Sequence, residues 1–281
     1  MKILPPFSPP WPPLARKGTL DPMCLVALAW KTHPRWRLLM AGNRDEFHAR
    51  PTTALARWPA PQASVVAGRD LRSGGTWMGL NDAGHAAVLT NVRDPAAATG
   101  GPSRGALVAG FLAGTTPAAT RIDALAGNAG DFAPFNLLLA DADGCHYLGN
   151  HPPMRQALAP GVHGMSNGVL DAPWPKTRRL MAALEHWLAQ DDPPLDGLWA
   201  ALSVEWRPAD ADLPATGIPL ELERHLSAAF IRGEDYGTRA GTILALDHAS
   251  HGFIVERRFG PQGVFLGETR IDLLGAHLGA R

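Results

Sequence analysis

Met23-Cys-Leu-Val-Ala-Leu-Ala-Trp30 decides the fold, because every residue of this short stretch is apolar. The pattern predicts a buried strand over Cys24–Trp30. Thr32-His-Pro-Arg35 predicts a turn, and Trp36-Arg-Leu-Leu-Met-Ala41 predicts a second strand that returns along the first. Gly42-Asn-Arg-Asp-Glu-Phe47 then ends that strand. Four polar residues, Asn43–Glu46, are therefore expected at the strand's end and beside Cys24.

The rest of the chain continues as short strands near both ends, with helical spacing in the middle. This order favours packed antiparallel sheets covered by helices over a parallel βαβ series. Gly74-Gly75 is expected to allow a turn and a close backbone approach. The predicted strands are Thr76–Leu80, His85–Thr90, Phe135–Asp141, Cys145–Gly149, Thr238–Asp247 and Gly252–Phe259, and the predicted helices are Gly105–Ala113, Trp174–Gln190 and Leu195–Ser203.

Composition excludes several function classes. The 281 residues carry 26 basic and 26 acidic side chains, with no block of five like charges, so neither a nucleic acid nor an anionic membrane is expected as a partner. No apolar run approaches the roughly 20 residues of a spanning helix. Two cysteines cannot form a disulfide scaffold, which favours a reducing compartment such as the cytoplasm. No cysteine or histidine spacing typical of a metal site occurs.

Residues 1–22 differ from the remainder because they hold seven prolines. Proline removes backbone donors and blocks helices, so a disordered extension is expected here. A targeting peptide and a start site placed too early are the open alternatives for this segment. The chemistry-bearing part then begins at Met23, and residues 23–281 are expected to form a single domain.

Cys24 is the strongest candidate for a catalytic residue in the sequence. Removing a methionine in front of it would leave a free α-amine on the nucleophile's own residue. That amine has a pKa of about 7.7–8.0 and the thiol one of about 8.5, so the two can exchange a proton. An arginine nearby would favour the thiolate, and a carboxylate could hold the amine. The alternatives are an inert core cysteine and, for Asn43–Glu46, a solvated loop with a local ion pair.

Several motifs in this order resemble the NRDE family, also known as the transport-and-Golgi-organisation family. The resemblance covers about residues 23–260. The motifs are Met23-Cys-Leu25, Ala41-Gly-Asn-Arg-Asp-Glu-Phe47, Arg50-Pro51, Gly74-Gly-Thr-Trp-Met-Gly79, Leu89-Thr-Asn91, Ser103-Arg-Gly105, Phe135-Asn-Leu137, Gly164-Met-Ser-Asn167, Pro173-Trp174 and Tyr236-Gly-Thr-Arg239.

That family is similar to the N-terminal-nucleophile hydrolases, nearest to the penicillin V acylase and bile-salt hydrolase branch. The resemblance implies an α+β fold built as a four-layer αββα sandwich, with Cys24 as nucleophile. The acylases read Arg-Asn-x-Asp where this chain reads Asn-Arg-Asp-Glu, so the identity of each partner stays open. The implied catalytic neighbours of Cys24 are Arg44 and Asp45, and Glu46 is the alternative to Asp45. The resemblance implies Asn91 and Asn167 as donors to the oxyanion. The implied substrate-binding residues are Asn43, Glu46, Trp77 and Arg239.

Two functions follow from the resemblance. The first is a cysteine amidohydrolase that cleaves a linear C–N amide of a small molecule and requires no cofactor. The second is a non-enzymatic carrier of haem or of acyl-coenzyme A and lipids on the same fold. Haem would need an axial ligand such as Cys24 or a nearby histidine. Neither the substrate, the oligomeric state nor the true N-terminus follows from the sequence.

Overall fold

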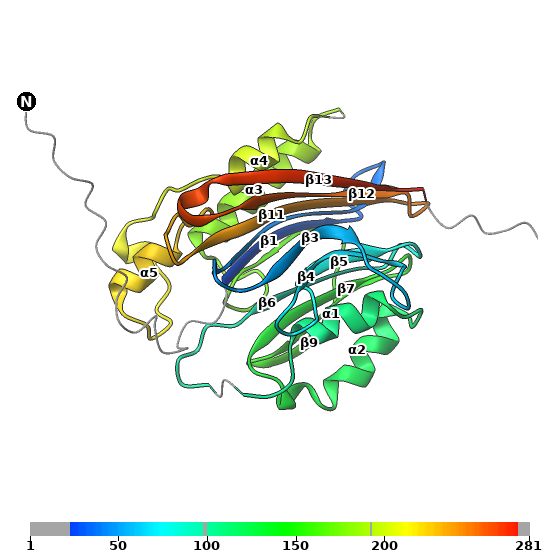
Figure 1. The fold of residues 1–281 in the computed structure, drawn as a ribbon, viewed down its shortest axis with the longest axis horizontal. Coiled ribbons are helices and arrows are strands. Elements are labelled where there is room, and N and C mark those ends of the chain that lie inside the picture. Colours follow the sequence, from blue (N-terminus) through cyan, green and yellow to red (C-terminus); the bar gives the residue numbers. More distant parts are fainter. Residues whose placement is uncertain (1–22, 98–99, 192, 275–281) are drawn as a thin grey trace, which may run out of the picture.

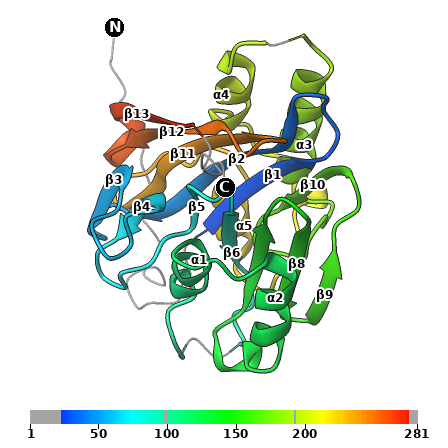
Figure 2. The same ribbon diagram turned by 90° about the vertical axis from the view of Figure 1, so that its right-hand side faces the viewer.

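Two antiparallel sheets stacked face to face form the centre of the molecule, and helices cover both outer faces (Figures 1 and 2). This is a computed structural model, and it describes residues 23–97, 100–191 and 193–274. The expected four-layer αββα arrangement is confirmed. Residues 1–22, expected to be a disordered extension, lie outside the described residues. None of the described helices is both long and apolar enough to cross a membrane.

The first sheet has six strands in the order β10-β1-β2-β11-β12-β13, and the second has seven in the order β3 to β9. All neighbouring strands run antiparallel. The strands of the first sheet are β10 (Gly161–Met165), β1 (Met23–Trp30), β2 (Trp36–Phe47), β11 (Tyr236–Asp247), β12 (Gly252–Phe259) and β13 (Phe265–Leu273). Those of the second are β3 (Thr52–Arg57), β4 (Val65–Asp70), β5 (Met78–Asn81), β6 (Ala86–Asn91), β7 (Phe135–Ala140), β8 (Cys145–Asn150) and β9 (Pro153–Ala157).

Helices close the sandwich on each side (Figure 2). Helices α3 (Pro175–Leu188) and α4 (Asp196–Leu202) pack on the first sheet, and α1 (Gly105–Leu112) and α2 (Ala118–Ala126) pack on the second. The short α5 (Leu220–Leu226) lies at the end of the first sheet where β1 begins, and it contacts Met23.

The alternation of side chains along β1 explains why it is apolar throughout. Val26, Leu28 and Trp30 enter the core between the sheets. Leu25, Ala27 and Ala29 enter the core under α3 and α4. A strand that is buried on both faces needs a continuous apolar run rather than an alternating one.

Each strand and helix expected from the sequence is present, and apart from the end of β2 the observed ends lie within two residues of the expected ones. The expectation that β2 ends before the polar segment is wrong. Asn43–Glu46 lie inside β2, which continues to Phe47 and pairs with β1 on one side and β11 on the other. These polar residues remain in the strand because both neighbours satisfy its backbone. Strands β3, β4, β9, β10 and β13 and helices α2 and α5 were not anticipated.

Two glycine positions allow close contacts around this centre. A Cβ on Gly75 would lie 2.4 Å from the carbonyl carbon of Gly105, and Gly74 has a positive φ of 76°, which confirms the expected turn and close approach. A Cβ on Gly42 would lie 2.6 Å from the Leu25 carbonyl oxygen and 3.2 Å from the Trp77 ring. Gly42 thus lets β2 pack against β1 and leaves space for Trp77.

We expect Gly42→Ala to destabilise the protein by roughly 1–3 kcal/mol, because the added methyl group overpacks the centre of the sandwich. Gly127→Ala is the matched control, since a Cβ at Gly127 meets no atom within 4 Å. The control should change the free energy of unfolding by less than about 0.5 kcal/mol. Urea unfolding measures both, and equal midpoints for the two variants would contradict the packing described here.

Candidate active site

The polar segment of β2 divides its side chains between the two faces of the first sheet. Met40 and Val26 lie in the core between the sheets, whereas Ala41 lies under the helices. Alternation therefore directs Arg44 and Glu46 between the sheets, and Asn43 and Asp45 toward the helices. Cys24 is the direct cross-strand partner of Arg44, and Met23 is that of Asp45. The prediction that this segment lies beside Cys24 is confirmed.

Cys24 lies at a cavity of about 220 Å³ between the two sheets. Arg44 and Glu46 line it from β2, and Trp77 and Asn91 line it from the second sheet. The loop from Gly100 to Gly105, which leads into α1, also lines it. Four of the predicted site residues, in addition to the cysteine, thus meet in one cavity.

Four charged side chains form a compact network at this cavity. An Arg44 guanidinium nitrogen lies 3.2 Å from Glu46 Oε2 and 3.7 Å from Asp70 Oδ2. Arg50 Nε lies 3.3 Å from Glu46 Oε2 and 2.6 Å from Asp70 Oδ2. Each cation is shared by both carboxylates, so Arg44 is partly neutralised before it acts on Cys24.

The Cys24 thiol is held in its neutral form in this chain. Burial, followed by the nearby Asp45 carboxylate, raises its pKa to about 12. Arg44 and Lys176 pull the pKa down, but they do not outweigh burial and the carboxylates. The expectation that an arginine favours the thiolate is therefore correct in direction and too weak to decide the protonation state.

Asp45 is fully buried, and a hydrogen bond among the described residues reaches only one of its two carboxylate oxygens. Its Oδ1 accepts a 2.6 Å hydrogen bond from the Thr238 hydroxyl. Its Oδ2 finds no hydrogen-bond partner among the described residues. Burial raises the pKa of Asp45 to about 6. Close by, the Met23 backbone N–H donates to the Tyr236 hydroxyl at 2.9 Å. The surroundings of Met23 therefore contain a hydroxyl that accepts its N–H and a carboxylate oxygen that none of the described residues donates to.

Lys176 is a site residue that sequence reasoning missed. It lies in the first turn of α3 and is buried, and its Nζ donates to the Leu226 carbonyl at 2.9 Å. Burial lowers its pKa to about 8, although the Asp45 carboxylate acts in the opposite direction. A signal was present in the sequence: Lys176 occupies the same fourfold stripe as the buried Leu180 and Leu184. A lysine in the apolar stripe of a helix needs a buried partner.

The two asparagines expected to donate to an oxyanion hold different positions. Asn91 lines the cavity. The Nδ2 of Asn167 donates to the Asn91 carbonyl oxygen at 2.9 Å, and the neighbouring Ser166 hydroxyl donates to the Cys24 carbonyl oxygen at 2.8 Å. Asn167 thus ties the end of β6 to the segment that follows β10. Its role as an oxyanion donor stays a prediction.

The remaining predicted residues separate into two groups. Asn43 points away from the cavity, and its Nδ2 donates to the carbonyl oxygens of Leu202 and Ala229 at 2.7 and 2.8 Å. It fastens β2 to the helical layer. Arg239 lines a neighbouring cavity, and its Nη1 donates to the carbonyl oxygens of Phe47 and Arg50. Among the described residues, no three His, Cys, Asp or Glu side chains gather as a metal site would require.

We expect Cys24 in this chain to react with iodoacetamide at neutral pH at least about a hundredfold more slowly than in urea, because little thiolate forms. Asp45→Asn should accelerate the labelling of Cys24, since the carboxylate raises its pKa. Cys145 is an internal control: burial also raises its pKa to about 12, and Asp45 is not among the causes. Peptide mass spectrometry measures both sites, and labelling of native Cys24 at the rate of a free thiol would contradict this account.

Comparison with known proteins places the chain among its relatives. The family model of Transport and Golgi organisation 2 matches residues 23–261. The bovine Transport and Golgi organization protein 2 homolog is 30% identical over 84% of this chain and 92% of its own length. The human homolog is 29% identical over 88% of this chain and 97% of its own length.

Among solved structures, a Caenorhabditis elegans N-acylethanolamine-hydrolyzing acid amidase ortholog superposes with a TM-score of 0.49 and 9% identity, over 79% of this chain and 92% of that one. The family match covers most of the chain and includes Cys24, the polar segment of β2 and both asparagines. This protein belongs to the Transport and Golgi organisation 2 family.

Proposed function

We propose that this protein is a cysteine-nucleophile hydrolase of linear C–N amides in small molecules, active when Cys24 carries a free α-amine. One observation carries the proposal. A buried carboxylate, Asp45, has an oxygen that meets no hydrogen-bond donor in the described part of the chain, and Asp45 is the cross-strand partner of Met23. An unpaired buried carboxylate is costly, and a cation placed beside it removes that cost.

A free α-amine on Cys24 would be such a cation. With Met23 removed, the nitrogen of Cys24 would become the first atom of β1, next to the position where Met23 now faces Asp45. The Tyr236 hydroxyl now accepts from the Met23 N–H, so it lies close to the position that this amine would take. Asp45, rather than Glu46, is then the partner of the amine, because Glu46 already binds Arg44 and Arg50.

In the proposed reaction, the amine and Asp45 act on the helix-facing side of the first sheet, and the thiol acts on the side that faces the second sheet. The amine takes the thiol proton, and Asp45 stabilises the resulting ammonium. The Cys24 sulfur attacks the amide carbon from the cavity between the sheets, while a donor at Asn91 stabilises the oxyanion. The C–N bond breaks as the ammonium returns its proton to the leaving amine, and water then hydrolyses the thioester.

The chain with Met23 attached lacks this base. Its Cys24 nitrogen belongs to a peptide bond and has no basic lone pair at neutral pH. The thiol, with a pKa raised to about 12, cannot lose its proton to water at a useful rate. Cleavage between Met23 and Cys24 would therefore activate the enzyme.

Cavity size and lining favour a small polar substrate over haem. A volume of about 220 Å³ is below the roughly 300–1,000 Å³ of pockets for drug-sized ligands. Haem requires an axial His, Cys, Met or Tyr. Cys24 is the only such residue among the described residues that line the cavity, and it is a neutral thiol. The residues present therefore do not fit haem.

Three proteins test the proposal against a panel of small amides: the full-length chain, a chain starting at Met23 whose methionine is removed, and that chain with Cys24→Ala. Only the second should form an acyl-enzyme adduct, seen as a mass increase on the peptide that begins with Cys24. The Cys24→Ala protein controls for adducts elsewhere.

Equal adduct formation by the full-length chain would refute the amine as base, because in that chain the peptide bond to Met23 still blocks the nitrogen. If none of the three reacts while the processed chain binds haem or acyl-coenzyme A, the hydrolase proposal fails and a carrier role replaces it.

A further inference from the structure

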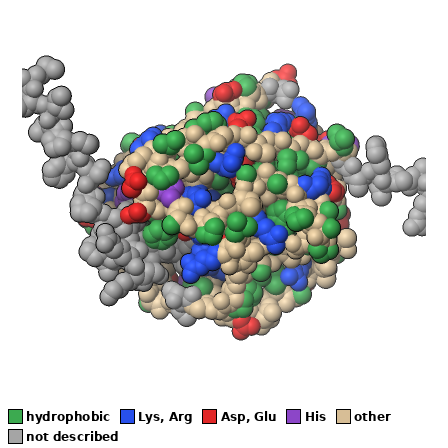
Figure 3. Space-filling view, viewed as in Figure 1, with side chains coloured by type: hydrophobic (Ala, Val, Ile, Leu, Met, Phe, Trp, Pro, Cys, Tyr) green, Lys and Arg blue, Asp and Glu red, His purple; other side chains and the backbone are tan. Residues whose placement is uncertain are grey.

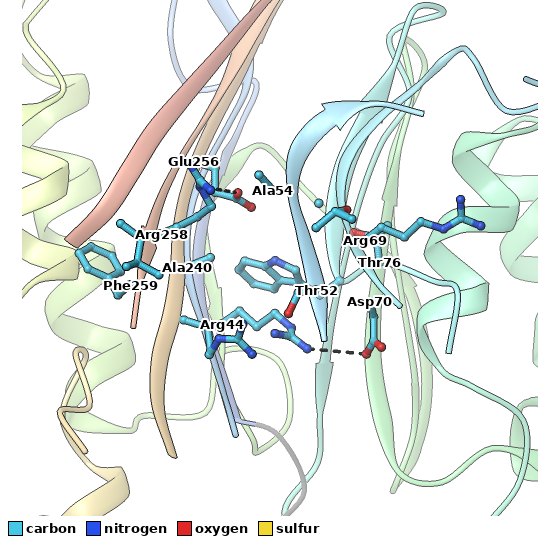
Figure 4. Close-up of a pocket in the computed structure, with 15 residues that line it drawn as sticks. Arg44, Thr52, Ala54, Arg69, Asp70, Thr76, Ala240, Glu256, Arg258 and Phe259 are labelled. Atoms are coloured by element: carbon cyan, nitrogen blue, oxygen red, sulfur yellow. Dashed lines mark ion pairs between the residues drawn. The ribbon is translucent and has the colours of Figure 1, made fainter. Parts of the chain in front are cut away.

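A second cavity, of about 150 Å³, opens beside the Cys24 cavity and shares Arg44, Asp70, Thr76 and Trp77 with it. It lies between the edges of the two sheets, with β11 and β12 on one side and β3 and β4 on the other (Figure 4). Figure 3 shows this face of the molecule, where hydrophobic and basic side chains intermingle and acidic ones are sparse at the centre.

Positive charge exceeds negative charge in this cavity. Three guanidinium groups line it, from Arg44, Arg239 and Arg258, against the carboxylates of Asp70 and Glu256. The Arg69 guanidinium points away from the cavity and lies over the Trp58 ring (Figure 4). Asp70 is already engaged by Arg50, whose Nε lies 2.6 Å away. Burial and the charge of Arg44 lower the pKa of Arg239, which indicates that the two cations repel each other across the cavity.

The second carboxylate, Glu256, forms a long ion pair with Arg258 but no hydrogen bond to its Nε (Figure 4). Glu256 Oε1 accepts a 2.8 Å hydrogen bond from the Leu55 N–H, and burial raises the pKa of Glu256. Its separation from Arg258 Nε is 4.0 Å, beyond hydrogen-bond distance. Arg258 Nε is buried and has no hydrogen-bond partner among the described residues. An unsatisfied guanidinium N–H next to a cavity is a donor available to an anion.

Alternation along β12 directs Arg258 into this cavity. Ile254 lies in the core between the sheets, so Glu256 and Arg258 face the same way. Arg257 points to the opposite face, where it lies over the Trp199 ring and pairs with Glu268 at 2.7 Å. Arg257 and Arg258, adjacent in β12, thus point to opposite faces of the first sheet.

The rest of the cavity wall is apolar. Trp77, Phe259 and Leu266 line it. Leu266 is 59% exposed, and its neighbours Val264 and Phe265 are exposed to a similar degree, so an apolar rim continues outward from the cavity. A ligand that satisfies both parts of the wall carries an anionic head and an apolar body.

We propose that this cavity binds the carboxylate of a small amphiphilic acid, with Arg258 and Arg239 at the anion and Trp77, Phe259 and Leu266 around the apolar part. The acid could be a free ligand or the acid end of the amide that Cys24 attacks, because the two cavities adjoin. Binding itself does not depend on the proposed hydrolysis, since none of these contacts involves Cys24.

Calorimetric titration of the full-length chain with sodium octanoate tests the proposal. Octanoate should bind, octylammonium should not, and inorganic phosphate should bind at least tenfold more weakly because it lacks the apolar part. Arg258→Gln should weaken octanoate binding at least tenfold. Arg257→Gln is the matched control with the same loss of charge on the same strand, and it should change the affinity less than twofold.

Arg258→Lys keeps the charge and should retain more affinity than Arg258→Gln, which separates loss of the anion contact from a folding defect. Cys24→Ala should bind octanoate like the unmodified chain, so this result is independent of whether any amide is cleaved. Absence of octanoate binding, equal losses in the Arg257 and Arg258 variants, equal binding of octylammonium, or phosphate binding as tight as octanoate would each overturn the proposal.

Discussion

The antiparallel register of β1 with β2 is the constraint on which the rest of the site depends. It sets Cys24 opposite Arg44 and Met23 opposite Asp45. Because β2 is also paired with β11 along most of its length, this register is held from both sides. A slip of one residue would exchange the two faces and move Arg44 out of the cavity. The same alternation places the Cys24 thiol and the Asp45 carboxylate on opposite faces of the first sheet.

This arrangement buries several charged side chains. Asp45 and Lys176 are both buried, and nearby a buried Arg93–Glu223 ion pair lies beside Met23, whose sulfur Arg93 also contacts. Such groups seldom improve stability over apolar residues, and perturbed charges tend to cluster at functional sites. In the chain with Met23 attached, burial and the Asp45 carboxylate outweigh the nearby cations and keep the thiol protonated. In the proposed hydrolase, this protonated thiol would keep the site inactive until the amine is exposed.

Local pattern was sufficient to predict some of these features. The apolar β1, the turn and the return of β2 placed Cys24 beside Asn43–Glu46 without any tertiary information. The length of β2 was not predictable in this way, because only the pairing with β11 explains why polar residues continue a buried strand. For the same reason the sequence did not show that Asn43 and Asp45 point toward the helices, opposite to Arg44 and Glu46. The contact of Asn167 with Asn91 joins residues 76 positions apart and has no local signal, whereas Lys176 had one in its helical stripe.

Titration of the Asp45 carboxyl carbon by NMR tests most directly whether this carboxylate holds the α-amine of Cys24. Two forms would be compared: the chain with Met23 attached and the processed chain that begins at Cys24. In the first, the midpoint should be at a pH of about 6. In the second it should fall well below that value, because an adjacent ammonium stabilises the carboxylate. The same midpoint in both forms would contradict the account, since the amine would then not lie beside Asp45.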